Sequence, residues 1–393
     1  MRVLHVVGSL DAHVGGSTTA GVETAAYLRQ LGVDAEVAGT WDSPPAADYI
    51  RAAWPDLPLH GFTRRAPRHY WRSPALRSWL GRETPSCDLV CVHGLFKFPF
   101  MDAARAARKH GVPYLVQPHS SLDPFDLQKH RLLKAGYGPL VVRPMLRHAA
   151  GVLVTTQREG DRLMTWGTTP EVHVLPLPVS APSAAAVGSR FRAAHAIPAD
   201  APVVLFLSRL HGKKNLEQLF RAVGRLAQRR PGLVLAIAGT GKPDYEQQLR
   251  RDAEASAGSA RVVWLGHLTG EDKWDAFAAA DVFALPSKNE NFGIVLLEAL
   301  MARTPAVVSH EVYLSDELSD VGVSVCALDI ESIEQAIAAV LDDPEAARRR
   351  TESARQFVLD RYDPVAVAKR TLALYERIIA PRAPRPLRHD AGR

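Results

Sequence analysis

In its second half the chain reads Ser287-Lys-Asn-Glu290-Asn-Phe-Gly293-Ile-Val-Leu-Leu-Glu298-Ala-Leu-Met-Ala302. The apolar run at residues 281–286 predicts a buried strand, and residues 294–302 predict a short helix that is apolar on nearly every face. Such a helix is buried, so Glu298 in its middle needs a polar partner, because an unpaired buried carboxylate is costly. Gly293 ends the polar turn just before the free N–H groups of the helix, an arrangement that suits a phosphate.

The stretch holds a second carboxylate, Glu290, in the polar turn. One ligand would use all of these features, with a diphosphate on the N–H groups, a sugar on one of the two glutamates and a ribose diol on the other. The two carboxylates on a strand–turn–helix resemble the Glu-x7-Glu signature of the retaining GT-B glycosyltransferases, the family-four or group 1 type. The resemblance implies that Glu290 holds the hydroxyls of the transferred sugar and that Glu298 holds the ribose. The alternative is a polar loop followed by a structural helix whose glutamate reaches solvent. The residues that the resemblance assigns to the donor in this stretch are Asn291, Phe292, Gly293, Ile294, Val295 and Glu298.

Composition limits the possible classes of protein. A chain of 393 residues is too long for one core, so two domains are expected. Hydrophobic residues at 47% and charged residues at 23% are typical of a soluble globular enzyme. The net charge of +6 fits an anionic small ligand or an anionic membrane surface and does not by itself indicate nucleic acid. Because Cys87, Cys91 and Cys326 lack metal-ligand spacing, we expect buried free thiols in a reducing compartment.

Strands that alternate with helices predict an α/β protein with two Rossmann-like, doubly wound parallel sheets. A strand at residues 2–7, a loop through Gly8, Gly15 and Gly16, and a helix at about residues 19–31 begin the first half. Other strands are expected at residues 34–40, 88–92, 113–116, 151–155, 172–175, 203–207, 233–238, 261–265, 306–309 and 323–327. The resemblance implies GT-B architecture, with the two domains facing a central cleft. We predict an acceptor-side domain at 1–179, a nucleotide-sugar domain at 180–363, a helix at 364–379 that crosses back to the first domain, and a disordered tail at 380–393.

A second set of polar residues follows the strand expected at residues 203–207. The sequence Leu207-Ser-Arg209-Leu-His-Gly-Lys-Lys214-Asn215 resembles the G-R-L-x-x-x-K-G loop of the family, in which Arg209 and Lys214 would neutralise the leaving nucleoside diphosphate. Fixed cations at this point stabilise the charge that develops on the departing phosphate; the alternative is a basic loop in water. Gly239 matches a glycine-rich turn near the nucleotide, although any tight turn favours glycine. Without an Asp-x-Asp motif at a strand end, neither a metal nor another cofactor is expected.

The first half supplies the remaining candidates. Gly15-Gly16 before a helix would, by resemblance, contact the donor diphosphate and the acceptor; a plain surface loop is the alternative. His119, in Pro118-His-Ser-Ser-Leu-Asp-Pro124, resembles the family histidine that lies against the transferred sugar, or it is simply a hydrogen-bonded loop residue. His93 follows another strand and is a candidate of the same kind. Basic and aromatic residues at 64–77 and 125–148 would meet an anionic lipid or a phosphate-bearing acceptor, or form solvated helix faces.

The sequence departs from the family pattern at several glycine positions. Asn215, Arg303, the pair His310-Glu311 and Ser120 stand where the family usually has glycine. These departures concern contacts with the sugar and the base. They leave the set Arg209, Lys214, Glu290 and Glu298 unchanged.

We therefore predict a retaining, metal-independent glycosyltransferase of the hexosyltransferase type. It would use a nucleotide-diphosphate sugar and a hydroxyl acceptor on a glycan, a glycolipid or a small-molecule glycoside. A cytoplasmic protein is expected, with peripheral contact at the inner face of the membrane left open and no nucleic-acid partner. The alternatives are a GT-B sugar-nucleotide epimerase or hydrolase and a non-catalytic sugar-nucleotide-binding protein. The catalytic candidates are Arg209, Lys214, Glu290 and His119.

Overall fold

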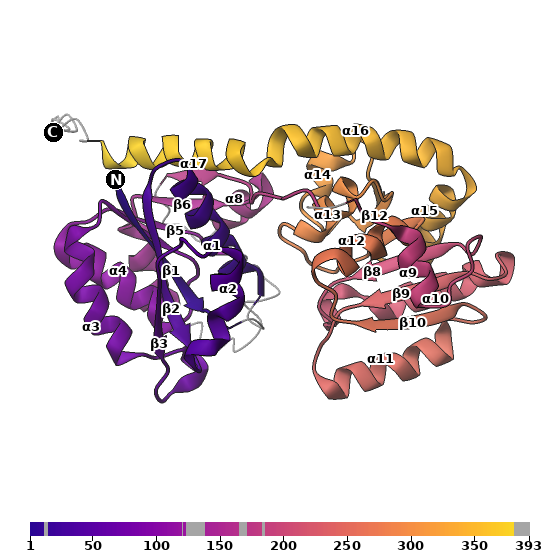
Figure 1. The fold of residues 1–393 in the computed structure, drawn as a ribbon, viewed down its shortest axis with the longest axis horizontal. Coiled ribbons are helices and arrows are strands. Elements are labelled where there is room, and N and C mark those ends of the chain that lie inside the picture. The colour runs from indigo at the N-terminus through magenta and orange to yellow at the C-terminus, as the bar shows by residue number, and fades with distance from the viewer. Residues whose placement is uncertain (12–14, 120, 123–137, 165–170, 183–184, 381–393) are drawn as a thin grey trace, which may run out of the picture. The chain divides into compact units, whose positions relative to one another are not determined.

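The computed structural model describes residues 1–11, 15–119, 121–122, 138–164, 171–182 and 185–380 (Figure 1). The chain divides into two compact units, the first formed by Met1–Pro178 with Pro364–Arg393 and the second by Val179–Asp363. The sequence predicts this division between residues 179 and 180, one residue later.

The first unit contains a seven-stranded sheet with the order β3-β2-β1-β4-β5-β6-β7. All of its neighbouring strands pair in parallel. Figure 1 shows α1 and α2 on one side of this sheet and α3 and α4 on the other. The strands are β1 (Arg2–Ser9), β2 (Asp34–Trp41), β3 (Leu59–Thr63), β4 (Leu89–Val92), β5 (Tyr114–Val116), β6 (Gly151–Val154) and β7 (Val172–Val174). The helices are α1 (Gly15–Gln30), α2 (Asp48–Ala53), α3 (Pro74–Glu83), α4 (Phe98–His110), α7 (Arg143–Arg147), α8 (Gln157–Met164) and α17 (Pro364–Ile379).

The second unit contains a six-stranded parallel sheet with the order β10-β9-β8-β11-β12-β13. Its strands are β8 (Val203–Leu207), β9 (Val234–Ala238), β10 (Arg261–Gly266), β11 (Val282–Leu285), β12 (Ala306–Ser309) and β13 (Ser324–Cys326). Its helices are α9 (Gly188–Ala194), α10 (Leu216–Arg229), α11 (Pro243–Ser256), α12 (Gly270–Ala279), α13 (Ile294–Met301), α14 (Ser315–Leu318), α15 (Ile330–Asp342) and α16 (Pro344–Tyr362). The predicted α/β class with two doubly wound parallel sheets is confirmed.

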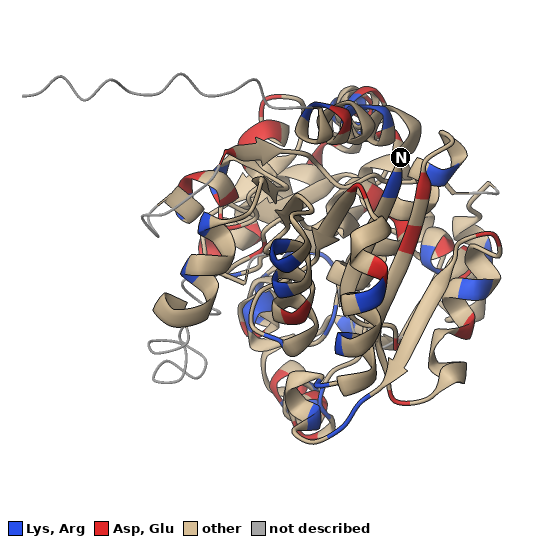
Figure 2. Ribbon diagram, turned by 90° about the vertical axis from the view of Figure 1, so that its left-hand side faces the viewer, with Lys and Arg blue, Asp and Glu red and all other residues tan. Residues whose placement is uncertain are grey.

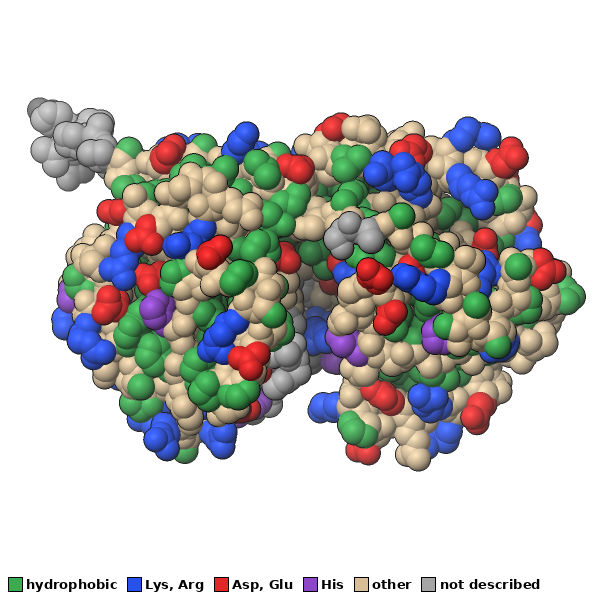
Figure 3. Space-filling view, in the orientation of Figure 1, with side chains coloured by type: hydrophobic (Ala, Val, Ile, Leu, Met, Phe, Trp, Pro, Cys, Tyr) green, Lys and Arg blue, Asp and Glu red, His purple; other side chains and the backbone are tan. Residues whose placement is uncertain are grey.

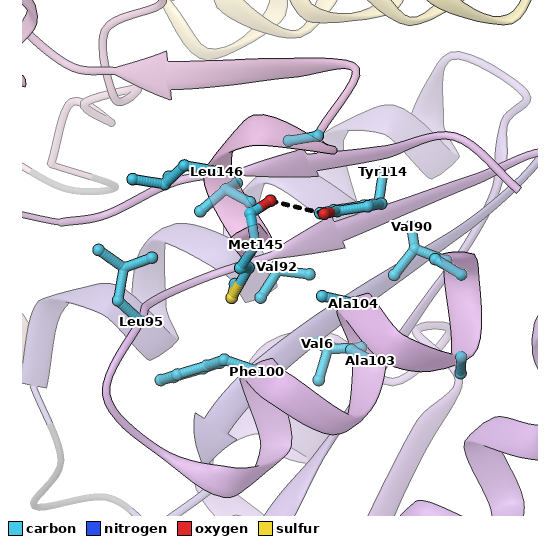
Figure 4. Packing of buried hydrophobic residues seen from close by; sticks show 14 of the residues in the cluster. Val6, Val90, Val92, Leu95, Phe100, Ala103, Ala104, Tyr114, Met145 and Leu146 are labelled. Carbon is cyan, nitrogen blue, oxygen red and sulfur yellow. Dashed lines mark hydrogen bonds between the residues drawn. The ribbon is translucent and has the colours of Figure 1, made fainter. Parts of the chain in front are cut away.

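The strands form where the sequence supplies continuous apolar runs, because a parallel sheet is covered on both faces. In the first unit β1, β4 and β5 are almost entirely buried. Figure 4 shows Val6, Val92 and Phe100 gathered in one core, where the hydroxyl of Tyr114 donates to the carbonyl oxygen of Met145 at 2.5 Å. This bond satisfies the polar end of a fully buried ring. Apolar burial and a paired hydroxyl thus hold α7 against the sheet.

The structure corrects the beginning of the chain. Gly8 lies within β1 instead of a loop, and α1 begins at Gly15 rather than near residue 19. Glycine is a poor helix former, so the pair Gly15-Gly16 concealed the first turn of this helix. The edge strand β3 was not predicted. The tail predicted to be disordered falls, from residue 381 onward, outside the described residues.

The surface carries charges of both signs. Figure 2 shows basic and acidic positions interspersed along the helices of the first unit, and the faces drawn in Figure 3 mix basic, acidic and hydrophobic side chains. Within the described parts of the chain, the structure contains no helix long and apolar enough to cross a membrane. The three cysteines are buried free thiols, as predicted, and burial raises the pKa of the Cys91 thiol to about 12.

Candidate active site

The second unit places its candidate residues at the point where the sheet changes direction. From β8 the chain proceeds outward through β9 and β10, and from β11 it proceeds the other way through β12 and β13. In open α/β sheets the ligand crevice lies at the carboxyl ends of the strands at such a point. The loops that follow β8 and β11 meet there, because the N–H of Lys288 donates to the carbonyl oxygen of Lys213 at 2.7 Å.

Lys214 and Glu290 form an ion pair at this point, with Nζ against Oε2. The side chains are mostly buried, with 11% of Lys214 and 21% of Glu290 exposed. A charge at such a depth is tolerated when an opposite charge and hydrogen bonds accompany it. The structure therefore joins two residues that the sequence analysis assigned to neighbouring parts of one ligand.

Backbone hydrogen bonds hold Glu290 in place. Its N–H donates to the carbonyl oxygen of Glu311 at 2.9 Å, and its carbonyl oxygen accepts from the N–H of Tyr313 at 2.9 Å. The amide of Asn289 donates to the hydroxyl of Tyr313 at 3.2 Å. The contact with Glu311 uses only its backbone, so a side chain in place of the family's glycine leaves this support intact.

Gly293 sets the start of α13. Its φ of 67° lies in the left-handed region, and a Cβ added there would lie 3.1 Å from Cγ of Glu290. Glycine adopts this conformation without steric strain. The N–H groups of Ile294 and Val295, the first two of α13, have no partner within the helix itself, which suits an anion. Phe292 is buried and packs edge-on against Tyr362, with ring centroids 5.9 Å apart.

Glu298 has a partner that the sequence analysis missed. Nζ of Lys273, on α12, lies 2.7 Å from Oε1 of Glu298, and the two side chains are 22% and 16% exposed. The lysine also lies 5.0 Å from the ring centroid of Trp274. A carboxylate in an apolar helix signals that a polar partner must exist, but only the tertiary structure identifies a residue 25 positions away.

Arg209 and Gly239 occupy neighbouring turns with different roles. Arg209 is exposed, and no hydrogen bond or ion pair joins it to another residue in the described parts of the chain. Gly239 has a φ of 137°, and an added Cβ would lie 1.9 Å from the carbonyl oxygen of Ser208. Glycine at this position is therefore required by backbone packing, whether or not a ligand approaches it.

Two of the departures from the family pattern keep the backbone conformation of glycine. Asn215 has a φ of 59° and Arg303 a φ of 61°, both in the left-handed region. Asparagine is among the residues that tolerate this region best. The chain therefore retains the turn geometry at these positions without glycine. Ser120, a third departure, lies outside the described residues.

The first unit holds the glycine pair and the histidines. Gly15 and Gly16 are the first residues of α1, and a Cβ added to Gly16 would meet nothing within 4 Å. Nδ1 of His93 lies 3.2 Å from Nε2 of His119, and Nε2 of His93 lies 3.0 Å from Nδ1 of His5. His5 was not a candidate, because a single histidine within an apolar strand gives no sign of its partners.

Burial changes the protonation of these histidines. It lowers the pKa of His93 to about 4 and lowers the pKa values of His5 and His119 well below the usual range. Repulsion from a charged His93 acts in the same direction on both neighbours. All three rings are therefore neutral near pH 7.

The two basic segments differ from the expectation in part. Arg64 is buried and bonds to Asp11 at 2.5 Å, so it stabilises the end of β1 instead of facing a lipid. Its guanidinium also lies 5.7 Å from the ring centroid of Trp71. In the second segment Arg143 and Arg147 are exposed on α7. The other basic candidates of that segment, Lys129, His130, Arg131 and Lys134, lie outside the described residues.

Two family models match the chain. The model described as glycosyl transferases group 1 matches residues 189–357, and the model described as glycosyl transferase 4-like domain matches residues 15–178. Each match falls within one of the two units. Together they cover the second sheet, every strand of the first sheet except β1, and the candidate residues of both units.

Similar proteins support the same assignment. Glycogen synthase from Mycobacterium tuberculosis is 34% identical over 189 residues, which are 46% of this chain and about half, 45%, of that protein. D-inositol 3-phosphate glycosyltransferase from Saccharomonospora viridis is 29% identical over 379 residues, 89% of this chain and 86% of that protein. The structure of Anabaena Alr3699/HepE in complex with UDP-glucose shares the fold, with a TM-score of 0.79 at 19% identity over 96% of this chain and 100% of that one. The chain therefore belongs to the group 1 glycosyltransferases and has the GT-B fold.

Proposed function

We propose that the protein transfers a sugar from a nucleoside diphosphate sugar to a hydroxyl acceptor with retention of configuration. The observation that carries this proposal is the contact between Lys214 and Glu290 at the switch point of the second sheet. In a glycosyl donor the sugar is bonded directly to the diphosphate. A cation for the phosphate and a carboxylate for the sugar hydroxyls must therefore lie side by side, as these two residues do.

We propose the remaining roles from the family resemblance, and the geometry of the second unit is compatible with them. Arg209 and Lys214 would neutralise the departing diphosphate, and the N–H groups at the start of α13 would bind the distal phosphate. Glu298 would accept hydrogen bonds from the ribose, for which it keeps capacity because a carboxylate has about four lone-pair sites and Lys273 uses one. Gly239, Asn291 and Phe292 would shape the donor pocket.

Retention is proposed from the character of Glu290. Its carboxylate is already paired with a lysine. This pairing suits a group that accepts hydrogen bonds from the sugar hydroxyls more than it suits a nucleophile. The departing phosphate would then deprotonate the attacking hydroxyl on the same face of the sugar. His119, Gly15 and Gly16 of the first unit would contribute contacts with the sugar, the diphosphate and the acceptor.

The acceptor, the metal requirement and the location also belong to the proposal. We propose a hydroxyl of a glycan, glycolipid or small-molecule glycoside as the acceptor, and transfer that needs no divalent metal or other cofactor. Two cations already serve the diphosphate in this scheme. A cytoplasmic location with peripheral contact at the membrane fits the exposed Arg143 and Arg147.

A hydrolysis assay with UDP-, GDP- and ADP-sugars tests the activity. The protein should slowly release free sugar with unchanged anomeric configuration, measured by proton NMR, and the release should persist in EDTA. An epimerase would change the sugar itself, and a non-catalytic binding protein would release none. Loss of release in EDTA, restored by manganese or magnesium, would contradict metal independence.

A pair of lysine variants tests the assignment of the diphosphate. Lys214→Met should lower kcat by about 100- to 1000-fold, the usual effect of removing one preorganised charge stabiliser. Lys288→Met is the matched control, because Lys288 is exposed on the adjoining loop, and its kcat should stay unchanged. Equal turnover in both variants would contradict the assignment.

A further inference from the structure

Three histidines of the first unit form a row across neighbouring strands. His5 lies in β1, His93 directly follows β4, and His119 follows β5. These strands are consecutive in the sheet. The ring nitrogens approach to 3.0 Å between His5 and His93 and to 3.2 Å between His93 and His119. The planes of successive rings are inclined to each other by only 24° and 22°. Because each ring comes from a different strand or strand end, the sheet itself holds the row together.

The two ends of the row differ. At one end His5 is fully buried, and its Nε2 has no hydrogen-bond partner among the described residues. His93 in the middle is 2% exposed. At the other end His119 is partly exposed, and its Nδ1 is the ring nitrogen that the row does not use. The row therefore has a closed end and an open end.

Proton counting restricts the tautomers of the three rings. A neutral imidazole carries one N–H, and its other nitrogen accepts. The gap between two ring nitrogens must hold exactly one proton, because two protons would repel and none would leave two lone pairs facing each other. When His5 carries its proton on Nδ1, His93 and His119 must do the same, and when His119 carries it on Nε2, the other two must follow.

We propose that His93 and His5 are positioning residues that fix whether His119 offers a donor or an acceptor, through tautomers that change only together. When all three rings carry their protons on Nδ1, Nδ1 of His119 is an N–H donor. When all three carry them on Nε2, Nδ1 of His119 is an acceptor. Burial supports the neutral state that this linkage needs, since the pKa values of all three rings lie below the usual range.

The closed end distinguishes this row from a proton relay. Conversion between the two states requires one proton to leave Nδ1 of His119 and another to arrive at Nε2 of His5, while each gap proton crosses its gap. No described residue is hydrogen-bonded to Nε2 of His5 to supply this proton. Among the described residues the row therefore has no hydrogen-bond partner at this end with which to exchange a proton, and its consequence is the orientation and hydrogen-bonding polarity of His119.

The consequence for transfer rests on the proposed contact of His119 with the donor sugar, whereas the tautomer linkage does not. A sugar hydroxyl can donate or accept, so it could pair with His119 in two orientations. A fixed tautomer selects one of them. This would reduce the number of poses that the reacting sugar samples.

Nitrogen-15 NMR of the full chain labelled at histidine tests the linkage, because protonated and bare ring nitrogens have different chemical shifts. The three rings are assigned among the 15 histidines by single substitutions. At pH 7 we expect His5, His93 and His119 to carry their protons on the same ring nitrogen. A mixed set would overturn the proposal.

Variants separate a tautomer effect from a structural one. His93→Phe should leave His119 averaging between both tautomers, while His5→Phe should leave His93 and His119 matched, because their shared gap remains. His173→Phe, at a partly buried histidine in β7 of the first unit, is the control and should leave the row unchanged. A single, unchanged tautomer of His119 in His93→Phe would overturn the proposal.

Kinetics then tests the link to transfer. His93→Phe should lower kcat at least tenfold and leave the affinity for free nucleoside diphosphate unchanged, since that ligand lacks the sugar. Suppose that the natural sequence shows matched tautomers but His93→Phe transfers the sugar at the normal rate. This result would overturn the contact of His119 with the sugar, and thus that part of the proposed function, but not the tautomer linkage.

Discussion

Lys214 and Glu290 show how one contact between two residues constrains the chemistry. Each is mostly buried, and each would be costly there without the other. A donor that places its phosphate on Lys214 and its hydroxyls on Glu290 would therefore act on a pair that already interacts. The carboxylate weakens the attraction of the lysine for phosphate, and this effect can be measured.

The first prediction concerns Glu290→Gln. The amide keeps the size of the side chain but removes the negative charge beside Lys214, so the affinity for free nucleoside diphosphate should stay equal or rise severalfold. Transfer should fall, because the sugar hydroxyls lose a charged acceptor. Calorimetric titration and steady-state kinetics measure the two effects. A large loss of affinity for the nucleoside diphosphate would show that Glu290 holds the nucleotide and not the sugar.

The second prediction compares Glu298→Gln with Lys273→Met. Hydrogen bonds to a charged group contribute about 1.5–3 kcal/mol, so Glu298→Gln should weaken nucleoside diphosphate binding by about tenfold or more. Lys273→Met should weaken it less, because the carboxylate and its lone pairs remain. Lys273→Arg is the control that keeps the ion pair. If neither Glu298→Gln nor Lys273→Met changes the affinity, the pair is purely structural.

At the scale of elements, α13 depends on the conformation of the residue before it. Gly293 begins the helix from the left-handed region and lies against Glu290. Asn215 begins α10 from the same region, with a φ of 59°. Both helices that start at the switch point therefore begin from a residue in the left-handed conformation.

The third prediction compares Gly293→Ala with Gly16→Ala. The left-handed conformation disfavours alanine by about 1–2 kcal/mol, and the new Cβ would press on Glu290, so Gly293→Ala should lower both stability and transfer. Gly16→Ala should stabilise α1 by about 0.5–1 kcal/mol, since its Cβ meets no described atom. Denaturant unfolding and kinetics measure both. Full transfer activity in Gly293→Ala would contradict the importance of this helix start.

The sequence was sufficient for elements whose signal is local. The apolar runs of β8 and β12 predicted the bounds of these strands. The edge strand β3 was missed because Leu59–Thr63 has neither an apolar run nor alternation. The partners of Glu298 and His5 could not be predicted, since each depends on which distant elements pack together.

At the scale of the whole molecule, the buried histidines couple stability to pH. An unfolded chain binds protons on histidine below about pH 6.5, while burial keeps His5, His93 and His119 neutral to a much lower pH. The unfolded state therefore binds more protons across this window. By linkage, stability falls as the pH falls, and each group contributes up to about 1.4 kcal/mol per pH unit.

The last prediction uses this slope. Between pH 6.5 and 5 each of the three histidines should remove up to about 2 kcal/mol of stability, and most of this loss precedes the titration of ordinary carboxyl groups. His5→Phe removes one of the three, so the stability of the variant should fall with pH less steeply than that of the natural sequence. Urea unfolding of the full chain at several pH values, followed at the transition of the first unit, gives the free energy of unfolding against pH. The difference in slope between variant and natural sequence does not depend on any change in stability at pH 7. Equal slopes would mean that His5 becomes charged in the folded protein at mildly acidic pH, which its complete burial and its contact with His93 argue against.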